Sequence, residues 1–179
     1  MDAKVDSRLE DLLARQEIYA LICAYARAQD RLDTALQLSV FWPDAWTDYG
    51  YFAGYAEDFV AYAQGALRAQ ESSHHLIGQV DIDIQGDVAF GEVYTLAQMR
   101  TFGDAASAKE HFVGGRYIDR YERRGGVWKI AFRSELVDWV RTEPVAESLL
   151  GGAWTPRRGG RGPLDMSFDR DAWPRPPQR

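Results

Sequence analysis

Three residues of this chain are the first candidates for proton transfer: two adjacent histidines, His74 and His75, and the acid Asp30. Histidine titrates near neutral pH, so a histidine that faces a cavity can act as a general base. A carboxylate bound to its other ring nitrogen would fix the tautomer and stabilise the protonated ring. Asp30, at the expected end of a long helix, is the candidate for that role. The ordinary interpretations are surface strand residues for the histidines and a helix-terminal or turn residue for Asp30.

Only one of the two histidines can face the cavity, because neighbouring residues of a strand point to opposite faces of the sheet. The alternation over residues 80–84 (Val-Asp-Ile-Asp-Ile) places His74, not His75, on the apolar face. A bulge at Gly78 would reverse this parity and turn His75 toward the interior. The pattern alone leaves both possibilities open.

Six tyrosines lie on elements expected to line one interior, and each hydroxyl is a possible hydrogen-bond donor: Tyr25, Tyr49, Tyr51, Tyr94, Tyr117 and Tyr121. A tyrosine hydroxyl in an apolar cavity can polarise a carbonyl or help a hydroxyl leave. Tyrosine is also an ordinary residue of a half-buried sheet. Arg133, in the middle of an expected strand, needs a ligand anion or a carboxylate partner, for which Glu135, Asp138 and Asp30 are the candidates.

A metal site is not expected. The chain has one cysteine, Cys23, and three histidines, and outside the segment that holds His74 and His75 it contains no His-x-His or Glu-x-x-His ligand pair. Adjacent histidines on a regular strand cannot both bind one metal ion. The single cysteine also excludes an internal disulfide.

The elements that must position these residues follow from the hydrophobic periodicity, which changes from helical to alternating near residue 70. We expect helices at residues 7–29, 33–41 and 55–68, and strands at 45–52, 75–84, 88–101, 111–122 and 127–140. Gln85-Gly86-Asp87 and Arg123-Arg124-Gly125-Gly126 are typical of hairpin turns. Helices followed by hairpin-connected strands predict an α+β domain.

The chain divides into two unequal parts. Residues 1–143 carry a net charge of −8 and form the expected domain, whereas residues 144–179 carry +2 and six of the seven prolines. This Pro/Gly/Arg-rich arm retains apolar residues such as Trp154 and Trp173, so we expect it to cover the domain or a neighbouring subunit.

The overall composition argues against several classes of partner. A net charge of −6 does not favour binding to nucleic acid. No stretch approaches the roughly 20 apolar residues that span a bilayer, and the polar N-terminus does not have the pattern of a signal peptide. A cytoplasmic location without a membrane partner is therefore expected.

Several segments, taken in order, resemble the SnoaL-like branch of the NTF2-like superfamily over about residues 8–141. They are Tyr25–Asp30, Phe41–Gly50, Ser73–Gln79, Ile84–Ala89, Gly115–Ile130, and Arg133 followed by Asp138-Trp139. Within that branch the chain is similar to scytalone dehydratase, bile-acid 7α-dehydratase and hexachlorocyclohexane dehydrochlorinase. It departs from scytalone dehydratase at Gln98-Met99-Arg100, where that enzyme has a second pocket histidine.

The resemblance implies a cone of curved, mainly antiparallel sheet (a cystatin-like α+β barrel) with about three N-terminal helices that cap one deep pocket. It implies catalysis without a cofactor by a histidine–aspartate pair, which falls on His75 and Asp30. The family's pocket tyrosines fall on Tyr49 and Tyr25, and its late-strand arginine falls on Arg133. The substrate-binding residues expected with Arg133 are Trp46, Phe59, Tyr62, Met99, Tyr117 and Phe132.

The function expected from this resemblance is a cofactor-independent lyase of the dehydratase type. Its substrate would be a hydrophobic, ring-bearing small molecule of polyketide or aromatic metabolism. The same pair would also serve a retro-aldol C–C lyase or an isomerase. A different class, a non-catalytic ligand-binding or oligomer-forming protein, would be favoured if His75 and Asp30 were too far apart to bond. A homodimer or homotrimer is expected in each case.

Overall fold

The computed structural model describes residues 3–103, 107–145, 156–171 and 173. Its three α-helices come first in the chain: α1 (Ala3–Arg31), α2 (Thr34–Ser39) and α3 (Ala56–Arg68). Each predicted helix is present, and α1 is longer than expected at both ends. Leu32, the residue directly after α1, has a φ of 56° and ends the helix. Asp33 then caps α2 by accepting a hydrogen bond from the Leu36 N–H at 2.9 Å.

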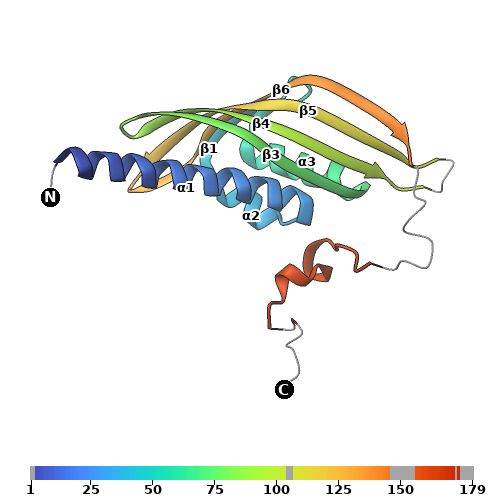
Figure 1. Cartoon of the computed structure of the whole chain (residues 1–179). Helices are drawn as coiled ribbons and strands as arrows, with labels where there is room; N and C mark the ends of the chain where they lie inside the picture. Colours follow the sequence, from blue (N-terminus) through green and yellow to red (C-terminus); the bar gives the residue numbers. More distant parts are fainter. Residues whose placement is uncertain (1–2, 104–106, 146–155, 172, 174–179) are drawn as a thin grey trace, which may run out of the picture.

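Six strands form one curved, mixed sheet: β1 (Phe41–Asp48), β2 (Ala53–Tyr55), β3 (Gln70–Gln85), β4 (Val88–Thr101), β5 (Lys109–Arg124) and β6 (Val127–Pro144). Their order is β2-β1-β6-β5-β4-β3, and β1 runs parallel to β6 while the other neighbours are antiparallel. β2 and β3 are edge strands, so the sheet is an open cone and not a closed barrel. The three helices lie on one face of this sheet (Figure 1).

The one strand that sequence periodicity misplaced is the first. A strand was expected at residues 45–52, but β1 begins at Phe41 and a separate strand, β2, follows Gly50. Pro43 lies where the pairing of β1 with β6 shifts register, between Phe41–Ile130 and Trp46–Phe132. Proline has no N–H to give to a regular ladder, so it is tolerated at this irregular position. The two later hairpins turn as predicted, at Gly86 and at Gly125-Gly126, all with positive φ.

The core fills the space between the helices and the inner face of the sheet. Ile18, Ile22 and Tyr25 form a fully buried stripe on α1 at helical spacing, and Phe59 and Val60 of α3 lie beside them. The sheet contributes a second set, in which Val93, Tyr121, Trp128 and Ile130 are buried. This packing fixes the direction in which the last turn of α1 points, and that turn carries Asp30.

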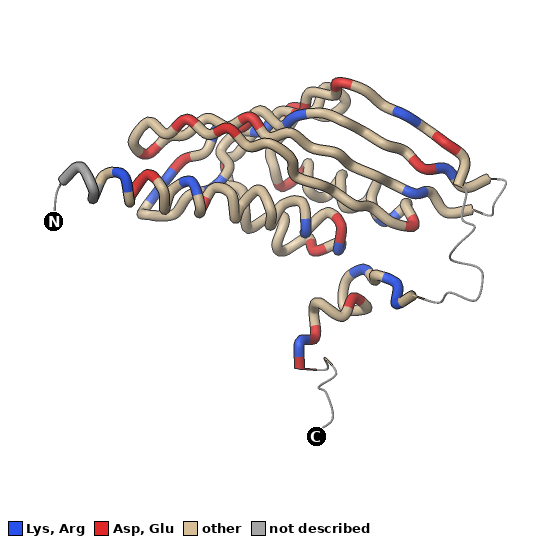
Figure 2. Tube along the Cα trace, in the orientation of Figure 1, with Lys and Arg blue, Asp and Glu red and all other residues tan. Residues whose placement is uncertain are grey.

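The described part of the C-terminal arm packs against the end of α1 and the start of β3. The Arg161 guanidinium donates to the carbonyls of Leu67 and Gln70 and to the Ser73 hydroxyl, at 2.7–2.8 Å. Arg31 donates to the Gly160 carbonyl at 2.8 Å. Basic residues are frequent in this segment (Figure 2), which contains the short helices η1 (Gly162–Leu164) and η2 (Met166–Phe168). Residues 146–155, which include Trp154, lie outside the described residues.

No helix in the described part of the chain is both long and apolar enough to cross a lipid bilayer.

Candidate active site

Asp30 and His75 are hydrogen-bonded partners at the junction of α1 and β3. The Asp30 Oδ1 lies 2.7 Å from the His75 Nδ1, and the Asp30 Oδ2 accepts from the His75 backbone N–H at 2.9 Å. Both side chains are more than 90% buried. An anion in the last turn of a helix is disfavoured by the helix dipole, so Asp30 gains its stabilisation from β3 and not from α1. Because Nδ1 is bound to the carboxylate, the basic lone pair of the ring is placed on Nε2.

A bulge in β3 decides which histidine faces inward. Ile77 pairs with Thr95 and Val80 pairs with Val93, so that Gly78 and Gln79 together oppose the single residue Tyr94. The inward-facing residues of β3 are therefore odd-numbered before the bulge and even-numbered after it. His75 lies on the helix side and contributes to a cavity wall, while His74 is exposed.

The cavity beside His75 has a volume of about 310 Å³ and lies between α3 and the inner face of the sheet. Its wall is mainly apolar and aromatic, with a few polar groups: Gln29, Tyr49, Tyr51, Phe59, Tyr62, Ala63, Ala66, Leu67, His75, Ala97, Met99, Val113, Tyr117, Glu135, Val137 and Val140. His75, Ala97, Val113 and Val140 are direct neighbours across four strands. Tyr62 and Val140 are at least half exposed and mark the mouth.

Tyr25 and Tyr49 form a hydrogen-bonded pair at the inner end of the cavity. Their hydroxyl oxygens are 2.8 Å apart, and the Gln29 side-chain amide donates to the Tyr25 hydroxyl at 3.1 Å. Either hydroxyl can be the donor in this pair, and when Tyr25 donates to Tyr49 the Tyr49 proton is left to donate into the cavity. Burial raises the pKa of Tyr25 to about 12 and the pKa of Tyr49 well above its ordinary value. Both hydroxyls are proton donors at neutral pH.

Arg133 is bound within the protein core. Its guanidinium donates to both oxygens of Asp119 at 2.7 Å, and both side chains are fully buried. It lies between the rings of Tyr25 and Tyr117, 4.2 Å from each ring centre. None of the three carboxylates considered from the sequence is its partner, because Asp119 faces it directly across the β5–β6 ladder. Arg133 does not line the cavity and acts as a support for two tyrosines.

The sequence-predicted site residues divide into three groups. The structure gathers Tyr49, Phe59, Tyr62, Met99 and Tyr117 around the cavity with His75, whereas Tyr25 and Arg133 lie behind that wall. Trp46 and Phe132 do not belong to the site. They pair across β1 and β6 on the face opposite Thr47 and Arg133, and Trp46 is 43% exposed against Tyr55. The alternation of strand residues rules out a shared face for Phe132 and Arg133.

Two polar residues of the cavity, Gln29 and Glu135, were not among the predicted site residues. Glu135 was considered only as a partner for Arg133. Its position two residues after Arg133, on the same face of β6, was the available signal. Gln29 lies one helical turn after Tyr25 on α1, and this i, i+4 spacing was its available signal.

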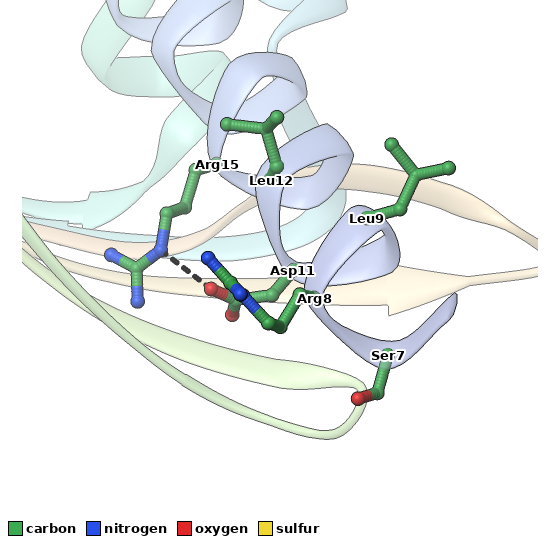
Figure 3. A pocket seen from close by; sticks show the side chains of 6 residues that line it. All are labelled: Ser7, Arg8, Leu9, Asp11, Leu12 and Arg15. Atoms are coloured by element: carbon green, nitrogen blue, oxygen red, sulfur yellow. Dashed lines mark hydrogen bonds and ion pairs between the residues drawn. The ribbon is translucent and has the colours of Figure 1, made fainter. Parts of the chain in front are cut away.

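A larger hollow, of about 580 Å³, runs along the N-terminal half of α1. Its wall holds the exposed ion pair of Asp11 and Arg15 together with the exposed side chains of Leu9 and Leu12 (Figure 3). It contains no buried titratable group, so the smaller cavity at His75 is the better candidate for chemistry. Among the described residues, no three His, Cys, Asp or Glu side chains are grouped as metal ligands would be.

An open α+β cone, with helices over one face and a cavity between the two layers, defines the NTF2-like class of proteins. The chain belongs to the SnoaL-like domain family, which matches residues 10–134. The family and the fold expected from the sequence are thereby confirmed. No curated protein matches the chain significantly in sequence.

Solved structures support the same fold at low sequence identity. LinA is 21% identical with a TM-score of 0.69, and the match covers 84% of this chain and 99% of LinA. A proposed scytalone dehydratase from Novosphingobium aromaticivorans is 18% identical, with a TM-score of 0.65 over 76% of this chain and 91% of that protein. A Nostoc punctiforme protein with a cystatin-like fold is 18% identical, with a TM-score of 0.58 over 70% of this chain and 92% of that protein. These similarities establish the fold alone.

Proposed function

We propose that the protein is a cofactor-independent lyase that acts on a hydrophobic, ring-bearing small molecule. The observation that carries this proposal is the buried Asp30–His75 hydrogen bond of 2.7 Å at the wall of an aromatic cavity. A carboxylate-held histidine is the arrangement that general-base catalysis requires. Dehydratase and dehydrochlorinase are among the activities of proteins with this fold, as hexachlorocyclohexane dehydrochlorinase from Novosphingobium barchaimii illustrates.

His75 is the base in this mechanism. Its Nε2 removes a proton from a carbon next to a carbonyl, phenol or other activating group, and Asp30 stabilises the imidazolium that forms. Tyr49, supported by Tyr25, donates a hydrogen bond to the oxygen on which negative charge develops. Acid–base assistance of this kind contributes roughly 10²–10⁴-fold to the rate.

The cavity supports a ring-bearing substrate. Tyr49 is stacked on Phe59 with ring centres 4.0 Å apart, so the two rings present a flat, rigid wall. Met99 and Tyr117 add apolar surface on the side of the sheet. A volume of about 310 Å³ is suited to a molecule of one or two rings.

The same base and donors would serve retro-aldol C–C cleavage or double-bond isomerisation. Among these reactions we favour elimination, because the structural neighbours include a proposed dehydratase and a dehydrochlorinase. A ligand-binding role without catalysis was expected to leave His75 and Asp30 apart, and their short contact argues for catalysis.

The experiment is a screen of aromatic and bicyclic β-hydroxy ketones with purified protein, with products identified by mass spectrometry. Loss of water supports elimination, and fragments with an aldehyde and a ketone indicate C–C cleavage. Replacement of His75 by alanine should abolish turnover, while His74→Ala, which changes the exposed neighbour, should not. Equal activity of the two variants would contradict the proposal.

We also propose that two or three copies of the chain associate through the outer face of the sheet. Leu76, Leu96, Gly114 and Trp139 are direct neighbours across four strands on that face. Their three large side chains are 38–56% exposed, and the helices all lie on the opposite face (Figure 1). An exposed apolar row of this kind is typical of an interface.

A further inference from the structure

Glu135 places a carboxyl group in the wall of the cavity that contains His75. It lies on β6 directly opposite Tyr117 of β5, and both residues line the cavity. β5 and β4 separate β6 from β3 in the sheet, so Glu135 and His75 enter the cavity from different strands. The cavity therefore has one nitrogen base and one carboxyl group, each available to a bound molecule.

Glu135 has no ionic or hydrogen-bonding partner among the residues that the structure describes. Arg133, the nearest cation on the same strand, makes its ion pair with Asp119 through Nε and Nη2 and makes none with Glu135. Arg116 on β5 binds Glu92 and Asp138 and lies outside the cavity. A partly buried carboxyl group without a partner is costly, so its presence in an aromatic cavity points to a role with a ligand.

The surroundings of Glu135 favour its protonated form. Burial is the largest influence and raises its pKa above the usual 4.5 of glutamate, while His75 and Arg133 act in the opposite direction. Three tyrosines interact electrostatically with Glu135: Tyr25, Tyr51 and Tyr117. When Glu135 is ionised, its negative charge contributes to the raised pKa of each hydroxyl. A carboxyl group with a raised pKa in the same cavity as a carboxylate-bound histidine offers an acid and a base to one ligand.

We propose that Glu135 is the proton donor of the reaction and that the substrate class is compounds that lose a hydroxyl group. This inference rests on the proposed lyase function and adds to it the leaving group. His75 takes a proton from carbon, and the electrons of the C–H bond form the new double bond. The C–O bond breaks, its electron pair stays on oxygen, and that oxygen takes the Glu135 proton and departs as water.

The cycle closes without any other reactant. After elimination the cavity holds protonated His75 and ionised Glu135, and transfer of one proton between them through solvent restores the starting state. A leaving group such as chloride departs as a stable anion and takes no proton. A requirement for Glu135 thus separates loss of water from loss of halide in this cavity.

The first arm of the test compares two substrates that yield the same enone, β-hydroxybutyrophenone and β-chlorobutyrophenone. Glu135→Gln keeps the size and removes the acidic proton, and Glu143→Gln changes an exposed glutamate of the same strand as a control. We expect Glu135→Gln to slow turnover of the hydroxy ketone by about 10²–10⁴-fold and to affect the chloro ketone far less. Equal effects on both substrates, or no effect on either, would overturn the role of Glu135.

The second arm needs no turnover. The C=O stretch of a protonated carboxyl group, assigned by its loss in Glu135→Gln, should persist in infrared spectra at neutral pH. An ionised Glu135 throughout the neutral range would overturn the proposal even if both ketones are inert. Failure of the lyase function is recognised separately, because His75→Ala would then leave turnover of both ketones unchanged.

Discussion

Asp30 binds His75 through both of its carboxylate oxygens, one to the ring and one to the backbone N–H of the same residue. The backbone contact fixes where β3 lies relative to the end of α1. The ring contact fixes the tautomer and orientation of the imidazole. One carboxylate therefore couples the packing of a helix on an edge strand to the position of the proposed base, and a small shift of α1 would be transmitted to the cavity.

The buried pair of Asp119 and Arg133 should be needed for stability. Asp119→Asn would leave the Arg133 charge without its counter-ion at a fully buried position, and we expect a loss of about 3–5 kcal/mol in the free energy of unfolding. Urea unfolding followed by circular dichroism measures it. The double variant Asp119→Leu with Arg133→Met should recover much of the loss, because it leaves no unpaired charge. A single variant as stable as the wild type would contradict the assignment.

Glu135 should make stability depend on pH. Its folded pKa is raised above the unfolded value of 4.5, so below that pH the group is protonated in both states and costs nothing. As pH rises through the window between the unfolded and folded pKa, the unfolded state loses its proton first and becomes favoured. Glu135→Gln should therefore gain stability relative to the wild type as the pH rises above 4.5, the unfolded pKa of the glutamate. The exposed-site control Glu143→Gln should show a flat difference, and a flat difference for Glu135→Gln would refute the raised pKa.

Most of the fold was predictable from the hydrophobic periodicity and the turn residues of the sequence alone. The three helices, the hairpins at Gly86 and Gly125-Gly126, and the four long strands were predicted within a few residues. β1 was misplaced because the aromatic run at residues 45–52 spans a strand, the Gly50 turn and the approach to a second strand. Leu9 and Leu12 belong to the apolar stripe of α1 but are exposed. Such a stripe in the sequence therefore does not show which residues pack over it.

The site was predictable to the extent that it depends on local alternation. The parity conflict between the two histidines was visible in the sequence, and the bulge at Gly78-Gln79 resolves it for His75. Phe132 could have been excluded by its adjacency to Arg133. Asp119 as the partner of Arg133 could not be predicted, because that pairing depends on the register of β5 against β6, including an irregularity after Arg120.

Trp139 should control association of the subunits. It lies over Gly114 on the outer face and is 50% exposed. Trp139→Lys places a charge in the proposed interface and should shift the elution of the protein to that of a monomer, with little change in the unfolding of each subunit. Sizing chromatography with light scattering measures this, and the exposed Leu12 of α1, on the helix side of the sheet, provides a control as Leu12→Lys. A wild-type monomer, or a Trp139→Lys variant that remains assembled, would refute this interface.

Arg161 should hold the C-terminal arm against the domain. Arg161→Ala removes hydrogen bonds to two backbone carbonyls and to Ser73, which together should cost about 1.5–3 kcal/mol of local stability. Hydrogen exchange should rise in residues 156–171 and at the start of β3. Arg170→Ala, in the same segment, serves as the control. Unchanged exchange around Ser73 would show that Arg161 does not anchor the arm.

If Asp30 makes His75 a base, turnover must depend on the Asp30 carboxylate, and the Asp30→Asn variant measures that dependence. An asparagine retains the shape and can still accept from the His75 backbone N–H, but it no longer stabilises the imidazolium or fixes the ring tautomer. With the hydroxy ketone that the wild type dehydrates, we predict that kcat falls by about 10²–10⁴-fold while the unfolding transition stays cooperative. Retention of most of the wild-type kcat by this folded variant would contradict the account.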